Sequence, residues 1–331
     1  MAGPVTGPET AARPAAGDVV AIGELLVDFA CRDTDAAGYP LLQANPGGAP
    51  ANVLAAVAAC GLRACLIAKV GDDAFGRLLV ASLARAGVSA AGVVTDPDVF
   101  TTLAFVTIDG EGERAFSFAR KPGADARLRP DEVDGGLIDG ARLLHFGSVS
   151  MTDEPARAAT RAAVARAKRA GAYVSFDPNL RPPLWRDPAA ARREIEWGLA
   201  QADVVKLSGE EAAFLFGDGA PETAANRLID AYGVSLAAVT LGADGCLLRI
   251  PTAVVRAAAP AVRPVDTTGA GDIFCGYLLA RLLTAGVAPA ALDEERLAAI
   301  ARAATVAASL STERHGGLSA VPAEAEVLSR L

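Results

Sequence analysis

A turn that contains two glycines and ends in a carboxylate leads into an apolar helix near the C-terminal end of the chain. Residues 266–272 read Asp-Thr-Thr-Gly-Ala-Gly-Asp, and the apolar residues that follow predict a helix from Ala270 to Ala285. Gly269 and Gly271 lack Cβ atoms, so their N–H groups can approach a ligand closely. A helix N-terminus adds unpaired N–H donors and partial positive charge, so the segment predicts a site for phosphate or another developing anion.

Asp272 does not suit a site that only binds anions, because its carboxylate would repel the ligand. A carboxylate is useful there if it takes a proton from an attacking hydroxyl. The segment therefore predicts phosphoryl transfer to an alcohol, with Asp272 as the general base. Aspartate also caps helices well, and capping alone would explain the residue. The segment by itself leaves both interpretations open.

Two earlier segments place polar groups where a ligand would bind. Asp28 follows the predicted strand 18–23, and open α/β sheets bind ligands at the carboxyl ends of their strands. Its carboxylate could accept hydrogen bonds from sugar hydroxyls, or it could be a solvated loop residue. Gly47 and Gly48 precede an alanine-rich predicted helix, and Asn52 in its first turn can donate and accept hydrogen bonds. An ordinary glycine turn would explain this second segment equally well.

Strands and helices alternate along most of the chain, which predicts an α/β fold with a mostly parallel sheet covered on both faces. The predicted strands are 18–23, 66–71, 143–146, 173–177, 204–207, 236–241 and 246–250, and the predicted helices are 75–86, 154–170, 189–200, 270–285 and 294–310. Ser208 and Glu211 have the spacing of a capping box. Residues 101–108 and 114–118 predict a β-hairpin, a candidate lid that excludes water from a transferable phosphoryl group.

Composition limits the class of protein. The 331 residues are 52% hydrophobic, enough for one large α/β domain, and the net charge of −8 argues against nucleic acid or an anionic membrane as partner. The 5 cysteines form no C-x-x-C pair, which favours reduced thiols in a cytoplasm. Residues 1–17 are rich in Ala, Pro and Gly without a basic start or a long apolar run. They are predicted to be a disordered tail rather than a signal peptide, which leaves 18–331 as a single domain.

Several enzyme classes are excluded by missing motifs. The sequence has no G-x-x-x-x-G-K-[ST], no G-x-G-x-x-G after its first predicted strand and no G-x-S-x-G. A P-loop enzyme, a Rossmann dehydrogenase and an α/β-hydrolase are therefore unsupported. With 2 histidines, a histidine metal site is not expected, and His145 is interpreted as a core or strand-end residue.

The glycine segments together resemble the two signatures of the ribokinase-like (pfkB-type) carbohydrate kinases. Residues 266–272 resemble the C-terminal signature, and Gly47-Gly48 and Asn52 with residues 71–76 resemble the N-terminal one. The likeness covers about residues 19–322. It implies a three-layer α/β/α fold with a mostly parallel central sheet and a small β-sheet lid, drawn from about 28–45 and 98–125. It also implies transfer of the γ-phosphoryl group of ATP to a sugar or nucleoside hydroxyl, in a cytoplasmic enzyme.

The resemblance implies roles for individual residues. Asp272 is the implied base, and the implied anion hole is Gly269, Ala270 and Gly271. The implied sugar-binding positions are Asp28, Gly47, Gly48 and Asn52. The implied nucleotide and phosphate positions are Lys206, Ser208, Glu211, Thr240, Gly242 and Gly245, with Mg²⁺ carried on phosphates and waters. Asp266 and Thr268 are implied ligands of a monovalent cation such as K⁺.

The sequence departs from the family pattern at three positions. Ser208 replaces the usual asparagine of an Asn-x-x-Glu motif, so it is also interpreted as a helix cap alone. Arg302 stands where many relatives have an asparagine near the adenine, which leaves the adenine contacts open. Ala119 stands where the family usually has an aromatic residue, directly before Arg120.

Within the family, the motifs are most similar to those of bacterial fructokinases. The segment 177–185 carries this likeness, and it implies sugar contacts from Arg120, Asp125 and Arg181. D-Fructose phosphorylated to fructose 6-phosphate is the predicted reaction. A 2-keto-3-deoxygluconate kinase, a kinase for another sugar or a nucleoside, and a catalytically silent sugar-binding protein remain alternatives. Relatives often pair through the lid, so a homodimer formed in this way is also predicted.

Overall fold

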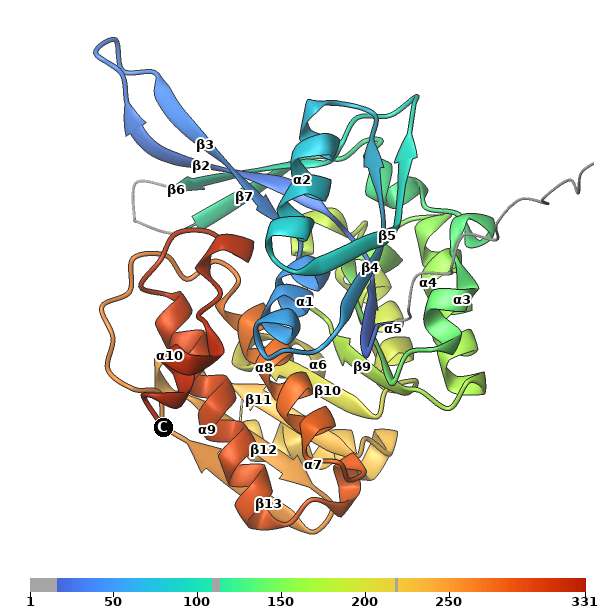
Figure 1. Cartoon of the computed structure of the whole chain (residues 1–331), viewed down its shortest axis with the longest axis vertical. Helices are drawn as coiled ribbons and strands as arrows, with labels where there is room; N and C mark the ends of the chain where they lie inside the picture. Colours follow the sequence, from blue (N-terminus) through green and yellow to red (C-terminus); the bar gives the residue numbers. More distant parts are fainter. Residues whose placement is uncertain (1–16, 109–113, 218–219) are drawn as a thin grey trace, which may run out of the picture.

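The computed structural model describes residues 17–108, 114–217 and 220–331. Most of the predicted tail, residues 1–16, and the turn of the predicted hairpin, residues 109–113, lie outside the described residues. Gly17 is already buried. The described chain forms a large sheet flanked by helices and a smaller second sheet (Figure 1).

The large sheet has nine strands. In spatial order they are β13 (Ala253–Ala257), β12 (Cys246–Ile250), β11 (Leu236–Thr240), β10 (Val204–Ser208), β9 (Tyr173–Asp177), β8 (Leu143–Gly147), β1 (Val19–Ile22), β4 (Ala64–Gly71) and β5 (Val88–Asp96). The β11–β12 and β12–β13 pairs are antiparallel and the other neighbours are parallel. The predicted mostly parallel sheet is therefore confirmed. His145 is a buried residue of β8 that contacts the Ser175 hydroxyl through Nδ1 at 3.1 Å, as expected of a core histidine.

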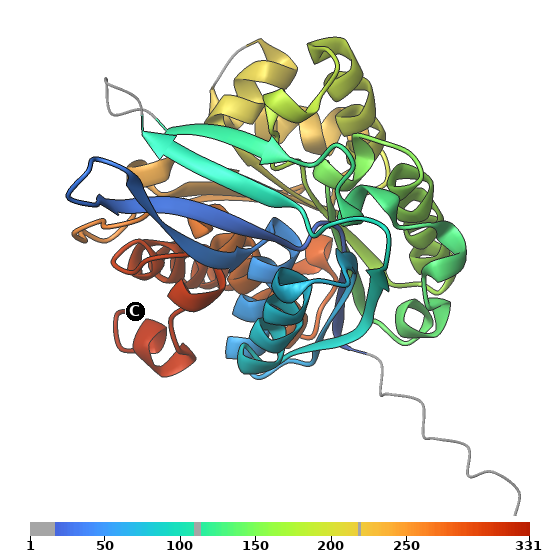
Figure 2. The same ribbon diagram turned by 90° about the horizontal axis from the view of Figure 1, so that it is seen from above.

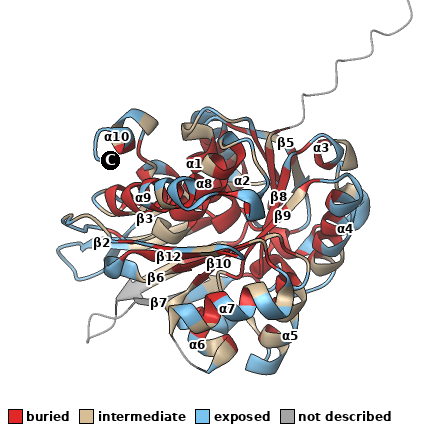
Figure 3. Cartoon of the chain, turned by 90° about the horizontal axis from the view of Figure 1, so that it is seen from below, coloured by how far each residue is buried: buried red, intermediate tan, exposed pale blue. Residues whose placement is uncertain are grey.

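Helices cover both faces of this sheet. Alternate side chains of each buried strand point to opposite faces, so the apolar side chains on each face need helices to bury them. In β1, Val19 and Ala21 join one apolar core, and Val20 and Ile22 join the other. The first core contains side chains of α1 (Ala49–Ala59), α2 (Ala74–Arg85), α8 (Ala270–Thr284), α9 (Glu294–Ser311) and α10 (Glu324–Leu328). The second contains those of α3 (Gly135–Asp139), α4 (Ala156–Arg169), α5 (Pro188–Leu199), α6 (Gly209–Phe216) and α7 (Pro221–Tyr232). Figure 3 shows the buried residues concentrated in the sheet and on the helix surfaces that face it.

Short 3-10 helices connect several of these elements. They are η1 (Ala124–Arg127), η2 (Pro130–Glu132), η3 (Val149–Met151), η4 (Pro182–Leu184), η5 (Gly242–Asp244), η6 (Pro289–Ala291) and η7 (Leu318–Ala320). Of the described helices, none combines the length and the apolar character that crossing a membrane requires.

The smaller sheet lies where the lid was predicted and is called the lid below. Its strands lie in the order β3 (Pro40–Gly47), β2 (Leu26–Thr34), β6 (Leu103–Ile108) and β7 (Arg114–Ala119). The predicted hairpin is β6–β7, and β2 pairs with β6 in parallel, which joins it to the β2–β3 hairpin. Figure 1 shows the β2–β3 hairpin projecting furthest from the body, and Figure 2 shows the two hairpins side by side.

Candidate active site

The turn before α8 adopts the geometry that the glycine spacing predicts. Gly269, the N-cap, has φ 78°, a left-handed conformation that favours glycine, and its carbonyl accepts the first helical hydrogen bond from Ile273 N at 2.9 Å. Asp272 lies in the first turn and is 8% exposed. The N-cap position belongs to Gly269, and among the described residues the Asp272 side chain accepts from Asn52 rather than from an N–H group of the helix. The observed geometry therefore differs from the simple capping interpretation.

Close packing of α1 on α8 brings a second polar group to Asp272. A Cβ at Gly276 would lie 2.4 Å from the Val53 carbonyl oxygen, so only glycine allows this approach of the two helices. Asn52, in the first turn of α1, donates a hydrogen bond from Nδ2 to Asp272 Oδ2 at 2.8 Å, although the two residues are 220 positions apart. Asn52 Oδ1 is buried and has no donor among the described residues, so it can accept from a ligand.

Burial raises the pKa of Asp272 above its ordinary value. The Asn52 amide and the positive charges of Lys206 and Arg181 oppose this shift. A buried carboxylate with a raised pKa is a better proton acceptor than a solvated aspartate, which suits a general base.

Asp272 lies in the wall of a cavity of about 590 Å³ between the lid and the large sheet. The predicted site residues that line it are Asp28, Gly48, Asn52, Arg181, Lys206, Thr268, Gly269, Gly271 and Asp272. The lining residues to which the sequence analysis assigned no role are Glu24, Leu26, Ala49, Phe118, Val149, Asn179, Leu184, Glu210 and Thr267. The structure thus brings together residues from seven separate parts of the described chain.

One side of the cavity is formed by the base of the smaller sheet. Asp28 lies inside β2 opposite Asn45 of β3, within the predicted lid segment 28–45 and not in a solvated loop. Gly47 ends β3 opposite Leu26, beside the cavity. Burial raises the pKa of Asp28 to about 7, although the positive charge of Arg181 opposes the shift.

Lys206, which lines the cavity, belongs to a buried ion pair. Lys206 Nζ is 3.0 Å from Asp177 Oδ2, and both residues are buried. Burial alone would lower the pKa of Lys206, but the carboxylates of Asp177 and Glu211 raise it above its ordinary value. Burial raises the pKa of Asp177, and the Lys206 charge opposes this. The short contact favours the charged pair.

The predicted capping box at the start of α6 is confirmed. Ser208 Oγ accepts from Glu211 N at 3.1 Å, and Glu211 Oε2 accepts from Ser208 N at 2.8 Å. Glu211 Oε1 accepts from Leu180 N at 2.8 Å, so both carboxylate oxygens already bind backbone groups. Of these two neighbouring glutamates, Glu210 is the one that lines the cavity.

Arg120 and Asp125 form a buried pair outside the lining of this cavity. Arg120 Nε donates to Asp125 Oδ2 at 2.8 Å, and its other nitrogens donate to the Thr152 hydroxyl at 2.7 Å and the Val149 carbonyl at 3.2 Å. Arg120 lines a second cavity of about 890 Å³, which shares Phe118 and Leu184 with the first. The implied direct contact of Arg120 with a sugar is therefore not supported by its position.

The remaining predicted positions do not line the first cavity. Thr240 ends β11 beside Ser208 of β10, and η5, which follows it, begins at Gly242 and is capped by Gly245. Asp266 accepts from Thr268 N at 3.0 Å and from Gly316 N at 3.2 Å, so its carboxylate closes the loop that precedes α8. Ala270 begins α8 but does not line the cavity. Among the described residues, no group of three or more His, Cys, Asp or Glu side chains could hold a metal ion.

Two lining residues without a predicted role stand at sequence positions that point to the site. Glu24 directly follows the first strand, and its Oε1 accepts from Ala49 N at the start of α1 at 3.1 Å. Asn179 has φ 45°, a left-handed conformation that asparagine tolerates better than most residues. It lies in the segment 177–185, whose likeness to fructokinases was noted without a role for this residue.

A glycine turn at a helix N-terminus, a buried carboxylate and a β lid over the sheet together define a kinase of small alcohols. The chain belongs to the pfkB family of carbohydrate kinases, since a model of the pfkB family carbohydrate kinase matches residues 16–324. Fructokinase-1 of Zea mays is 42% identical over 315 residues, which cover 94% of this chain and 96% of the maize protein.

Solved structures show the same likeness. A fructokinase from Xylella fastidiosa with bound ATP has a TM-score of 0.85 and 34% identity, covering 94% of this chain and 97% of its own. A double mutant of the Vibrio cholerae O395 fructokinase, in its fructose-, ADP- and potassium-bound form, has a TM-score of 0.83 and 34% identity, covering 96% and 99%. The predicted ribokinase-like three-layer fold is therefore confirmed.

Proposed function

We propose that the protein transfers the γ-phosphoryl group of ATP to the 6-hydroxyl of D-fructose, giving fructose 6-phosphate and ADP. The observation that carries the proposal is the buried Asp272 in the first turn of α8, held by Asn52 inside a cavity that reaches the lid. The fructokinases described above support the choice of acceptor.

In the proposed reaction, Asp272 takes the proton of the 6-hydroxyl as that oxygen attacks the γ-phosphorus. The bond between the γ-phosphorus and the β–γ bridging oxygen breaks, and ADP leaves. The N–H groups of Gly269, Ala270 and Gly271, at the positive end of α8, stabilise the charge that develops on the transferring group. Asn52 keeps the base oriented.

The other contacts follow from the positions of the lining residues. Asp28, Asn52 and the backbone at Gly47 and Gly48 would hold the sugar hydroxyls, with Arg181 nearby. Thr240, Gly242 and Gly245 would hold the nucleotide, and Lys206 would contact its phosphates. ATP would arrive with Mg²⁺ carried by its phosphates and waters, because the described residues offer no cage for the ion.

Three further features belong to the same proposal. K⁺ would bind at the loop of Asp266 and Thr268, as an aid to the anion hole. A homodimer would form through the lid, because Tyr39, Leu41 and Leu42 expose apolar side chains at its tip. A cytoplasmic location is favoured because the five cysteines are free thiols.

Release of ADP with a panel of acceptors tests this function. We expect turnover with ATP, Mg²⁺ and D-fructose, a lower kcat/KM with 2-keto-3-deoxygluconate or nucleosides, and no turnover in EDTA. A higher kcat/KM for the acid sugar would overturn the assigned acceptor. Sugar binding without ADP release from any acceptor would indicate a catalytically silent binding protein.

Replacing Arg181 with glutamine distinguishes fructose from an acid sugar. Arg181 is the one arginine that lines the cavity among the described residues, so a sugar carboxylate would depend on it. Neutral fructose has no such need, and we expect its KM to rise less than about tenfold, the effect of losing one charged hydrogen bond. Steady-state kinetics would check this, with Arg186→Gln, an exposed change in the same segment, as the control. A much steeper rise in the fructose KM would contradict a neutral acceptor at this arginine.

A further inference from the structure

In the described residues, two buried lysine–aspartate pairs join neighbouring strands of the large sheet. Lys69 of β4 lies 3.2 Å from Asp96, which ends β5, and Lys206 of β10 lies 3.0 Å from Asp177, which ends β9. In each pair the aspartate Oδ1 also accepts the N–H of the residue two positions later, Asp98 N at 3.0 Å or Asn179 N at 3.2 Å. The two pairs therefore share the same local construction.

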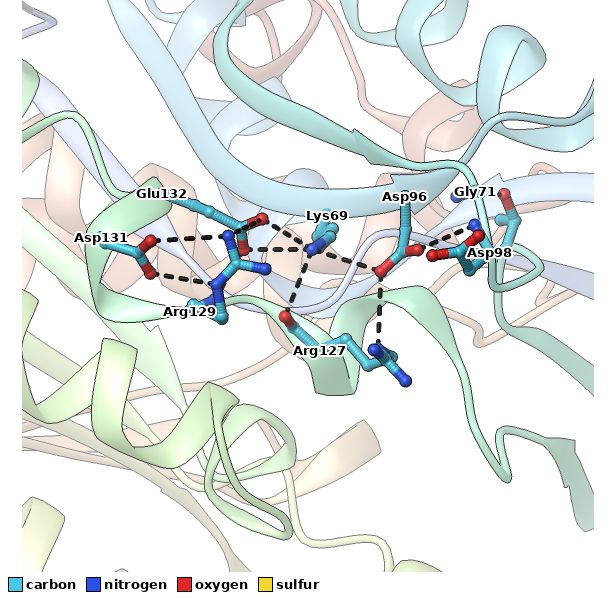
Figure 4. A network of polar contacts seen from close by, with 9 residues as sticks. Lys69, Gly71, Asp96, Asp98, Arg127, Arg129, Asp131 and Glu132 are labelled. Atoms are coloured by element: carbon cyan, nitrogen blue, oxygen red, sulfur yellow. Dashed lines mark hydrogen bonds and ion pairs between the residues drawn. The ribbon is translucent and has the colours of Figure 1, made fainter.

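The Lys69 ammonium is fully enclosed by protein acceptors. Besides Asp96, it donates to Glu132 Oε1 at 2.8 Å and to the Arg127 carbonyl at 3.4 Å, as Figure 4 shows. An ammonium group has three N–H donors, so this lysine is satisfied by the protein alone. Neither Lys69 nor Asp96 lines the candidate active site.

The Lys206 ammonium has fewer protein acceptors than the Lys69 ammonium. Within the described part of the chain, Asp177 is the one group at hydrogen-bond or ion-pair distance from Nζ. Lys206 is 6% exposed, and it lines the candidate active site. A methyl group at Gly271 would lie 3.2 Å from Nζ, so the ammonium lies against the first turn of α8. Its remaining N–H donors therefore lack acceptors at the place where an anionic ligand would supply them.

We propose that Asp177 is a positioning residue, which holds the Lys206 ammonium against the first turn of α8 so that its unpaired donors bind the oxygens of the transferring phosphoryl group. The inference rests on the proposed function and adds to it a residue that acts only through Lys206. Asp177 does not itself line the cavity.

The physical need for such a residue follows from the nature of lysine. Its side chain is flexible, and a buried ammonium without a partner is strongly unfavourable. A carboxylate on the adjacent strand supplies both the countercharge and a fixed direction. Asp177 accepts a hydrogen bond from the Asn179 N–H and is packed so that 2% of it is exposed, which fixes its carboxylate. The carboxylate can therefore hold Nζ at a defined position.

A double-mutant cycle tests the proposal. We expect Lys206→Met to lower kcat by ~10²-fold, as for the loss of one donor to a transition-state anion. Asp177→Asn, which keeps the Asn179 contact, should lower kcat by ~10–10²-fold through misplacement of Nζ. The double variant restores neutrality, and its kcat should equal that of Lys206→Met within a few-fold. If the kcat losses of the two single variants multiplied in the double variant, Asp177 would act independently of Lys206. This result would overturn the proposal.

Asp96→Asn is the matched control, because it removes a carboxylate from the other buried pair. It should lower the melting temperature without a comparable loss of kcat. A loss of kcat equal to that in Asp177→Asn would reduce the proposed role to general stability and overturn it.

Ligand binding separates this inference from the proposed acceptor. Calorimetry with Mg²⁺ and AMP-PNP should show weaker binding, about tenfold or more, for Asp177→Asn and Lys206→Met, while ADP binding changes little. This measurement does not depend on turnover. A wild-type protein that phosphorylates no sugar would refute the proposed function alone, whereas unchanged AMP-PNP affinity in both variants would refute the role of the pair.

Discussion

Replacing Asp272 with asparagine is expected to lower kcat for fructose by ~10²–10⁴-fold, the usual contribution of a general base. Asparagine keeps the size of the side chain and can still accept the Asn52 hydrogen bond, so only the proton acceptor is lost. Burial raises the pKa of Asp272, so removal of its charge should leave the melting temperature unchanged or slightly higher. Initial rates and thermal unfolding of the same preparation would measure both effects.

The pH dependence provides a second readout for Asp272. A base must be unprotonated, so kcat of the wild type should fall as the pH drops through the raised pKa of this residue, above the range of an ordinary aspartate. The residual activity of Asp272→Asn should lack this acid limb. Asp293→Asn is a suitable control, since Asp293 caps α9 through Arg296 N and lies on the surface. A kcat for Asp272→Asn within a few-fold of the wild type would refute the assignment as base.

The sequence predicted the elements that carry strong local signals. The glycine turn before α8, the Ser208 capping box and the buried strands around β9 follow from residue types within short windows. Strands β5 and β13 were missed. β5 contains Ser, Ala and Gly, which have low strand propensity, and it forms one edge of the large sheet. β5 is a strand because it pairs with β4, and a short sequence window holds no information about that pairing.

The contacts between distant segments could not be predicted from spacing. Asn52 and Asp272 meet only because α1 packs closely on α8 at Gly276, and this depends on the tertiary fold. Asp28 was interpreted either as a ligand-binding residue or as a solvated loop residue, and the structure places it in β2, between β3 and β6. Sequence likeness suggested Arg120 as a sugar contact. The buried Asp125 beside it takes up the guanidinium, a competition that the sequence alone does not reveal.

Replacing Asp28 with alanine is expected to lower kcat/KM for fructose by at least tenfold, with little change in nucleotide affinity. The carboxylate lines the cavity at the place proposed for the sugar, and charged hydrogen bonds to sugar hydroxyls would contribute ~1.5–3 kcal/mol each. Truncation also leaves the hydroxyls without acceptors in a buried site. Asp33→Ala, an exposed change on the same strand, should keep wild-type kinetics.

Titration of Asp28 gives this prediction a second, independent test. Burial raises its pKa to about 7, so protonation should remove the charged acceptor as the pH falls through that value. The fructose KM of the wild type should therefore rise below about pH 7, whereas the KM of Asp28→Asn should be high and nearly constant over the same range. Steady-state kinetics from pH 5.5 to about 8.5, with saturating ATP and Mg²⁺, would measure both profiles across the pH window in which a pKa near 7 titrates. If Asp28→Ala changed the KM for ATP alone, Asp28 would belong to the nucleotide side of the cavity, and its assignment to the acceptor would be wrong.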